Sequence, residues 1–194
     1  MMNRREILTG CVTLLGALSS VSRAMAQDRT AEGFAVRFLT DLVQIANGGQ
    51  PARVREHLRP IIDTKYAFDT AFAGIRISDG QRQRLTELML TFLAREAILV
   101  AEYAQGGQLR SESSRSVQLG TMVNLTYRDN HGPYPLNVLL ARSDTGVGYL
   151  VRDFGSERDS SVVTKLAYAT NSLQAVTSDT DIWIRSFEEV LGEG

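Results

Sequence analysis

The chain has 194 residues, a net charge of −1 at pH 7 and one cysteine, which is the composition of one ordinary globular domain rather than a disulfide-held scaffold. Lysine and arginine are scattered along the chain, without the basic cluster that phosphate backbones or anionic membrane surfaces attract. We therefore expect no nucleic-acid partner.

Residues 1–26 have the pattern of a cleaved export signal. Arg4 and Arg5 precede an apolar run over 7–21, and the small residues of 24–26 offer a cleavage site. The run is too short and too rich in Gly, Ser and Thr to be a spanning helix. The paired arginines favour twin-arginine export, with the general secretory route as the alternative. We expect the mature protein to be periplasmic.

The expected mature chain, 27–194, is a single domain of 168 residues, which is 194 minus 26. Its net charge is −3, because three Arg and one Glu are lost from a chain with a net charge of −1. Cys11 stands too early in the apolar run to be a lipid-attachment site. The mature protein is therefore expected to lack any thiol or disulfide.

The N-terminal half has helical periodicity. A first helix is predicted around 34–45, ended by 47–49, and a second begins at Pro51. Ser78 and Gln81 form a capping box at the start of a long helix that ends at 106–107. One broad apolar stripe is predicted along it, made of Leu85, Leu88, Met89, Phe92, Leu93, Leu99, Val100 and Tyr103.

The period then changes to two, which predicts strands. Three alternating sets occur, with turns at 130–133 and 143–146 between them, and such sequential strands favour an antiparallel meander. A final helix is predicted from about Ser178. The strand sets are Val123, Leu125 and Tyr127; Leu136, Val138 and Leu140; and Tyr149, Val151 and Asp153; the buried face of the last helix is Trp183, Phe187, Val190 and Leu191.

Helices followed by strands predict an α+β fold. The expected architecture has N-terminal helices, including the long one, packed on a curved antiparallel sheet of four to five strands, and a C-terminal helix. This is a cone-shaped arrangement like that of nuclear transport factor.

Few residues are candidates for chemistry. His57 and His131 stand at no metal-ligand spacing and are expected to be ordinary surface residues, so neither a metal site nor a cofactor is predicted. Glu96 falls inside the apolar stripe and needs a partner. We expect an ion pair with an arginine at the rim of the core, and the alternative is contact with a ligand headgroup or proton abstraction.

Asp153 is the other candidate. On the expected strand it shares a face with Tyr149 and Val151, so an isomerase-like pairing of an Asp base with Tyr127 or Tyr149 is one interpretation. The simpler interpretation is that Asp153 caps a neighbouring loop.

The order of motifs resembles the MlaC-like periplasmic phospholipid-transport family, also called the toluene-tolerance family. The resemblance spans about 34–190. It rests on 54–69, on Ser78-Asp79-Gly80-Gln81-Arg82-Gln83-Arg84 leading to Tyr103, on Tyr149-Leu150-Val151-Arg152-Asp153-Phe154, and on Ser160-Ser161-Val162-Val163. Segments 73–76 and 158–159 depart from the family pattern.

The resemblance implies a non-catalytic, monomeric shuttle that maintains outer-membrane lipid asymmetry. Its partners would be an inner-membrane ABC transporter complex and an outer-membrane lipoprotein complex, and its cargo a phospholipid or a hopanoid-like lipid. At about 0.8 kcal/mol per CH₂, two chains of about 16 carbons cost on the order of 25 kcal/mol to expose to water, so a carrier must enclose them. The lining would be Tyr66, Phe68, Phe72, Leu88, Phe92, Leu99, Tyr103, Val123, Leu125, Val138, Leu140 and Val151.

Two alternatives stay open. One is a small-molecule isomerase or hydrolase on a similar cone-shaped fold, and the other is a periplasmic adaptor whose apolar surfaces bind only protein.

Overall fold

The computed structural model describes residues 30–103, 107–129, 132–144, 148–156, 161–175, 177 and 179–192, with the side chain of Tyr103 outside the description. The expected leader, His131 and Ser178 also lie outside it. Helices and strands follow in the order α2 (Ala31–Ala46), α3 (Pro51–Leu58), α4 (Thr64–Ala71), α5 (Asp79–Tyr103), β1 (Gln108–Val117), β2 (Gly120–Asp129), β3 (Gly132–Arg142), β4 (Tyr149–Ser156), α6 (Val162–Gln174) and α7 (Thr180–Leu191).

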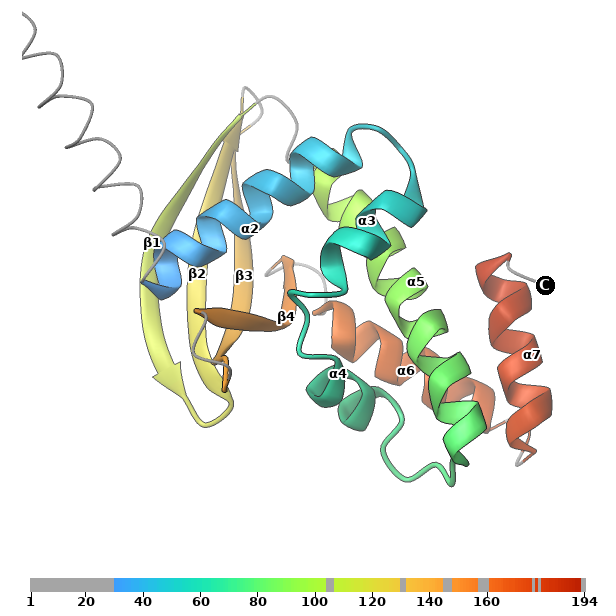
Figure 1. Cartoon of the computed structure of the whole chain (residues 1–194). Coiled ribbons are helices and arrows are strands. Elements are labelled where there is room, and N and C mark those ends of the chain that lie inside the picture. Colours follow the sequence, from blue (N-terminus) through green and yellow to red (C-terminus); the bar gives the residue numbers. More distant parts are fainter. Residues whose placement is uncertain are drawn as a thin grey trace, which may run out of the picture.

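The four described strands form one antiparallel sheet in the order β1-β2-β3-β4, which confirms the predicted meander and the α+β fold (Figure 1). Ile62 adds a parallel bridge to Val151 at the β4 edge. One face of the sheet is apolar and buried. Its residues are Val123, Leu125, Tyr127, Leu136, Val138, Leu140, Tyr149, Val151 and Phe154.

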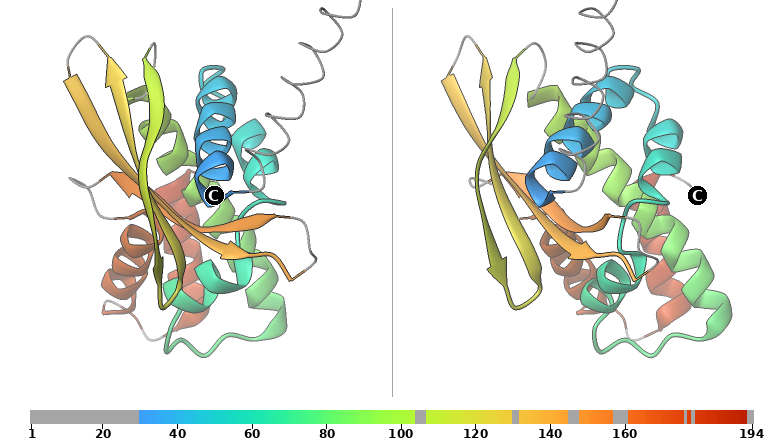
Figure 2. Two further views of the ribbon diagram at one scale, coloured as in Figure 1. Left: turned by 90° about the vertical axis from the view of Figure 1, so that its left-hand side faces the viewer. Right: turned by 60° about the vertical axis from the view of Figure 1, so that its left-hand side comes forward.

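Helix α2 covers the apolar face of the sheet. Its Phe34 ring lies 5.8 Å from that of Tyr149, and its Phe38 ring meets that of Phe154 edge to face at 5.6 Å, both between centroids. Figure 2 shows the sheet on one side of the molecule and α2, α3 and α5 on the other. Helix α5 packs on α2 and α3, so α2 is the middle layer between the sheet and the long helix.

A helical core lies beyond the end of the sheet. Phe72 meets Trp183 edge to face at 5.7 Å, and Trp183 stacks on Phe187 at the same centroid distance. Polar contacts also join α5 to α7: Gln81 donates to Asp181 at 2.8 Å, and Arg84 pairs with Glu188. Ring packing and polar side-chain contacts therefore hold the helices together at this end of the molecule.

The predicted helix starts are confirmed. The Ser78 amide donates to Gln81 Oε1 at 2.9 Å and the Gln81 amide to Ser78 Oγ at 3.4 Å, which is the reciprocal capping box. Pro51 occupies the first turn of α3. Asp179 accepts from the amides of residues 181 and 182 at the start of α7.

Three elements were not predicted as a helix or strand: α4, β1 and α6. Strand β1 is largely exposed, so it lacks the apolar alternation that identifies the other strands. Two residues expected on buried helix faces are exposed. Leu99 and Val190 are 47% and 70% exposed instead of buried. Within the described residues, no helix combines the length and hydropathy needed to cross a bilayer.

Candidate functional site

The candidate site is a partly open, mainly apolar pocket of about 210 Å³ at one end of the sheet. Three layers contribute to it: the C-terminal half of α2, the last turns of α5, and the ends of β1, β2 and β3. The pocket is therefore the place where the sheet, its covering helix and the long helix meet. Its lining is Leu39, Thr40, Leu42, Val43, Gln44, Val100, Ala101, Gly107, Leu109, Tyr127 and Leu136.

Tyr127 supplies a buried polar group of this pocket, whereas the other polar lining residues, Thr40 and Gln44, are exposed. Its side chain is 3% exposed, and its hydroxyl is a buried oxygen with no hydrogen-bond partner among the described residues. Burial raises the pKa of this phenol, while the nearby Gly107 amide opposes part of that rise. The hydroxyl therefore stays protonated at neutral pH and is available as a donor.

Gly107 is required by the position of Tyr127. A Cβ on residue 107 would collide with the Arg128 carbonyl and with the end of the Tyr127 ring. Because one of these atoms belongs to the backbone, a side chain could not be accommodated by a rotamer change alone. The absence of a side chain at residue 107 lets the Tyr127 ring lie against the start of β1.

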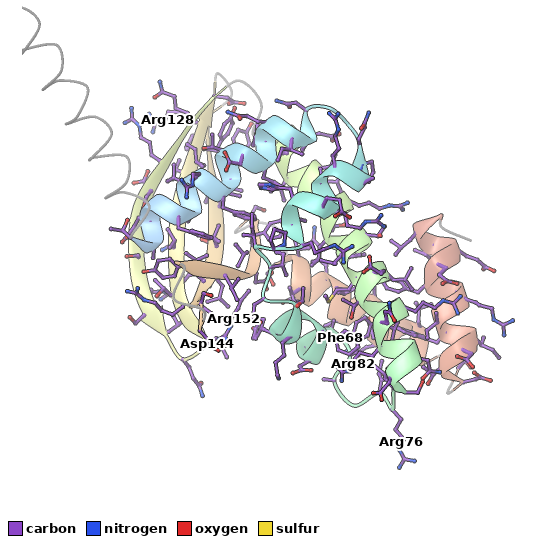
Figure 3. All side chains as sticks on the ribbon, in the orientation of Figure 1. Phe68, Arg76, Arg82, Arg128, Asp144 and Arg152 are labelled. Atoms are coloured by element: carbon purple, nitrogen blue, oxygen red, sulfur yellow. The ribbon has the colours of Figure 1, made fainter. Side chains whose placement is uncertain are left out.

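The predicted lining residues on the helices do not line this pocket. Phe68, Phe72 and Leu88 are buried in the helical core, where Arg82 also covers the Phe68 ring at 4.3 Å (Figure 3). Phe92 is partly buried and lies 6.4 Å from Phe187 between ring centroids. The ring of Tyr66 is covered by Arg152 at 4.9 Å.

The predicted lining residues on the sheet share a face with the pocket but lie deeper. Val123, Leu125, Val138, Leu140 and Val151 are at most 1% exposed. None of them is among the pocket-lining residues, although Tyr127 and Leu136 continue the same face. These residues therefore form the buried sheet face beside the pocket, and their role in binding lipid stays a prediction.

The contribution of α2 to the pocket was missed. Leu39 and Val43 line the pocket, whereas Phe38 packs on the sheet. An apolar surface that extends over adjacent sides of a helix is typical of a helix buried between two layers. The width of the apolar surface of α2 was the feature of the sequence that could have indicated its position between two layers.

Asp153 does not share a face with Val151, so its predicted orientation is wrong. Val151 pairs with Leu140 and Asp153 with Leu139, and the extra residue, Arg152, forms a bulge that turns Asp153 to the outer face. There Asp153 Oδ1 accepts from the Val163 amide at 3.0 Å. This is the capping role, and it places the carboxylate on the opposite face of the sheet from Tyr127.

Glu96 has an ion-pair partner, as predicted, but the partner is a lysine. Lys165 Nζ on α6 lies 3.0 Å from Glu96 Oε2, and the Glu96 side chain is 17% exposed. His57 is partly buried on α3 rather than fully on the surface. The described residues contain no group of three His, Cys, Asp or Glu side chains arranged to hold a metal ion.

Comparison with known proteins shows a similarity in fold. No protein-family model matches the sequence, and no curated protein matches it. Among solved structures, the fold is similar to that of a phospholipid-binding protein from Ralstonia solanacearum solved in complex with a phospholipid. The two share 14% sequence identity at a TM-score of 0.63, over 90% of this chain and 96% of that one.

Proposed function

We propose that this protein is a lipid carrier that encloses the acyl chains of a phospholipid. The observation that carries the proposal is the apolar pocket where α2, α5 and the sheet meet. The similarity in fold to a protein that binds phospholipid supports it independently. A hopanoid-like lipid is the alternative cargo.

Enclosing acyl chains requires the pocket to enlarge. Its volume of about 210 Å³ is below the ~300–1,000 Å³ of sites that enclose drug-sized ligands. The sheet face under α2 is the natural place for hydrocarbon, because β2, β3 and β4 present buried apolar side chains there and Tyr127 and Leu136 of this face also line the pocket. Lipid loading would therefore move α2 away from the sheet.

In this proposal the protein belongs to the MlaC-like family and works in the periplasm as a monomeric shuttle. It would exchange lipid with an inner-membrane ABC transporter complex and an outer-membrane lipoprotein complex, and so maintain outer-membrane lipid asymmetry. The sequence resemblance over 34–190 and the export-type leader support this assignment. No bond is made or broken in such a role, so it needs no catalytic residue.

Transfer between vesicles tests the proposed function. Donor vesicles carry a self-quenched fluorescent phospholipid, and acceptor vesicles carry none. The protein should raise the transfer rate in proportion to its concentration, because it removes the cost of exposing the tails to water. A rate equal to that of vesicles alone would contradict the proposal.

A further inference from the structure

The pocket contains a buried hydrogen-bond donor that no described residue accepts from. The Tyr127 hydroxyl is buried in a mainly apolar lining and lacks a partner among the described residues. A buried polar group without a partner is destabilising, because its desolvation is not compensated. A ligand that supplies an acceptor at this position would compensate for that desolvation.

The missing partner is specifically an acceptor. The Gly107 amide beside the hydroxyl is itself a donor and can serve only the lone pairs of the phenol oxygen, and the Arg128 carbonyl near Gly107 makes no hydrogen bond with the phenol. Tyr134, the cross-strand neighbour of Tyr127, has its ring centroid 6.3 Å away. The phenolic O–H therefore needs an oxygen from outside the described residues.

We propose that Tyr127 donates a hydrogen bond to an acyl-ester carbonyl of the bound lipid, so the site selects ester-linked lipids over ether-linked ones. The inference rests on the proposed function. An ester carbonyl is the acceptor that lies directly next to the hydrocarbon of a diacyl phospholipid. A tail held in the apolar pocket brings this oxygen to the polar end of the pocket.

A second, polar pocket borders Gly107 on the outer face of the sheet. Its lining includes Arg110 and Arg128 together with the carboxylates of Glu112 and Asp129, and Arg110 and Arg128 lie on the face opposite Tyr127. Figure 3 shows Arg128 at this end of the sheet. The two guanidinium groups are balanced by two carboxylates in this pocket, so the inference concerns only the ester carbonyl beside Tyr127 and not the headgroup.

Matched lipids test the inference. Binding of a diester phosphocholine and of its diether analogue, which lacks both carbonyls, is measured with the wild type, Tyr127→Phe and Tyr134→Phe. The wild type should bind the diester about 3- to 10-fold more tightly than the diether, the range expected for one hydrogen bond. Tyr127→Phe should remove this preference, and Tyr134→Phe should keep it.

The outcomes separate this inference from the proposed function. Equal binding of both lipids by the wild type would overturn the inference while leaving the carrier function intact, and this comparison needs no variant to fold. An equal loss for both lipids in Tyr127→Phe would also overturn it, because the acceptor would then be shared by the two lipids. Failure of the wild type to bind either lipid would contradict the proposed function itself.

Discussion

Asp153 on β4 lies opposite Leu139 on β3, on the face of the sheet turned away from α2. The bulge at Arg152 produces this arrangement. The Arg152 side chain donates a hydrogen bond of 2.9 Å from Nε to Asp63 Oδ2. An isomerase would need the Asp153 carboxylate and the Tyr127 hydroxyl in one cavity, yet they lie on opposite faces. The geometry therefore favours a structural role for Asp153.

Asp153→Asn should change the pH dependence of stability and leave lipid binding intact. Burial raises the pKa of Asp153 above 3.8 despite hydrogen bonds that oppose the rise. A carboxyl with a raised folded-state pKa stabilises the fold below its unfolded-state pKa, and that contribution is lost as pH rises through the folded-state pKa. The variant does not titrate at this position.

The unfolding free energy of the variant minus that of the wild type should therefore increase as pH rises from 3.8. Urea denaturation of both proteins at about pH 3.5 and about pH 7 measures this difference. A difference that decreases with pH, or a loss of lipid binding in the variant, would contradict the structural role.

Filling the pocket should reduce lipid binding. Val43 is a partly buried lining residue on α2, so Val43→Phe places an aromatic ring in the space proposed for a tail. Val36 on the same helix is also partly buried but does not line the pocket, which makes Val36→Phe the matched control. We expect a roughly 5- to 150-fold loss of affinity for Val43→Phe alone, from overpacking of about 1–3 kcal/mol. Equal affinities in the two variants would place the lipid elsewhere.

Tying α2 to the sheet should block loading. The Ser114 hydroxyl on β1 donates to the Glu32 carboxylate at the start of α2, so these positions are close and accessible. The chain's one native cysteine, Cys11, lies in the expected signal. A short, reducible thiol cross-linker across Glu32→Cys and Ser114→Cys should stop lipid uptake, and reduction should restore it. The two single variants, treated identically, should load normally. Normal uptake by the cross-linked protein would show that loading does not require this end of α2 to move away from the sheet.

Lys165→Met should lower stability without affecting lipid binding. The substitution leaves the largely buried Glu96 carboxylate without its ion-pair partner at 3.0 Å. Because the Lys165 side chain is 37% exposed, we expect a loss of about 1 kcal/mol rather than that of a fully buried pair. Thermal denaturation and lipid affinity measure the two effects. A large loss of affinity at unchanged stability would instead favour the headgroup role of Glu96.

Local patterns in the sequence were sufficient to predict most of the fold. The Ser78 and Gln81 capping box, Pro51 at a helix start and the alternation around Val123 and Val138 each depend on neighbours a few residues away. Such signals survive in a single sequence because the backbone imposes their spacing. They led to the correct α+β class and to the meander.

The positions that were wrong depend on tertiary context. A single apolar stripe along α5 assumes neighbours on one side throughout, but five helices, α2, α3, α4, α6 and α7, contact α5. Leu88 is buried, whereas Leu99 is exposed. The bulge at Arg152 has no signature in the local pattern, so it reversed the predicted face of Asp153. The pocket itself depends on α2 crossing the sheet, which periodicity does not specify.

Native mass spectrometry of the protein purified after export tests the central claim most directly. The account predicts a population whose mass exceeds that of the polypeptide by one phospholipid, released on gentle activation. That population should be depleted in Val43→Phe and retained in Val36→Phe. An empty wild-type chain that stays empty after incubation with phospholipid vesicles would contradict the account.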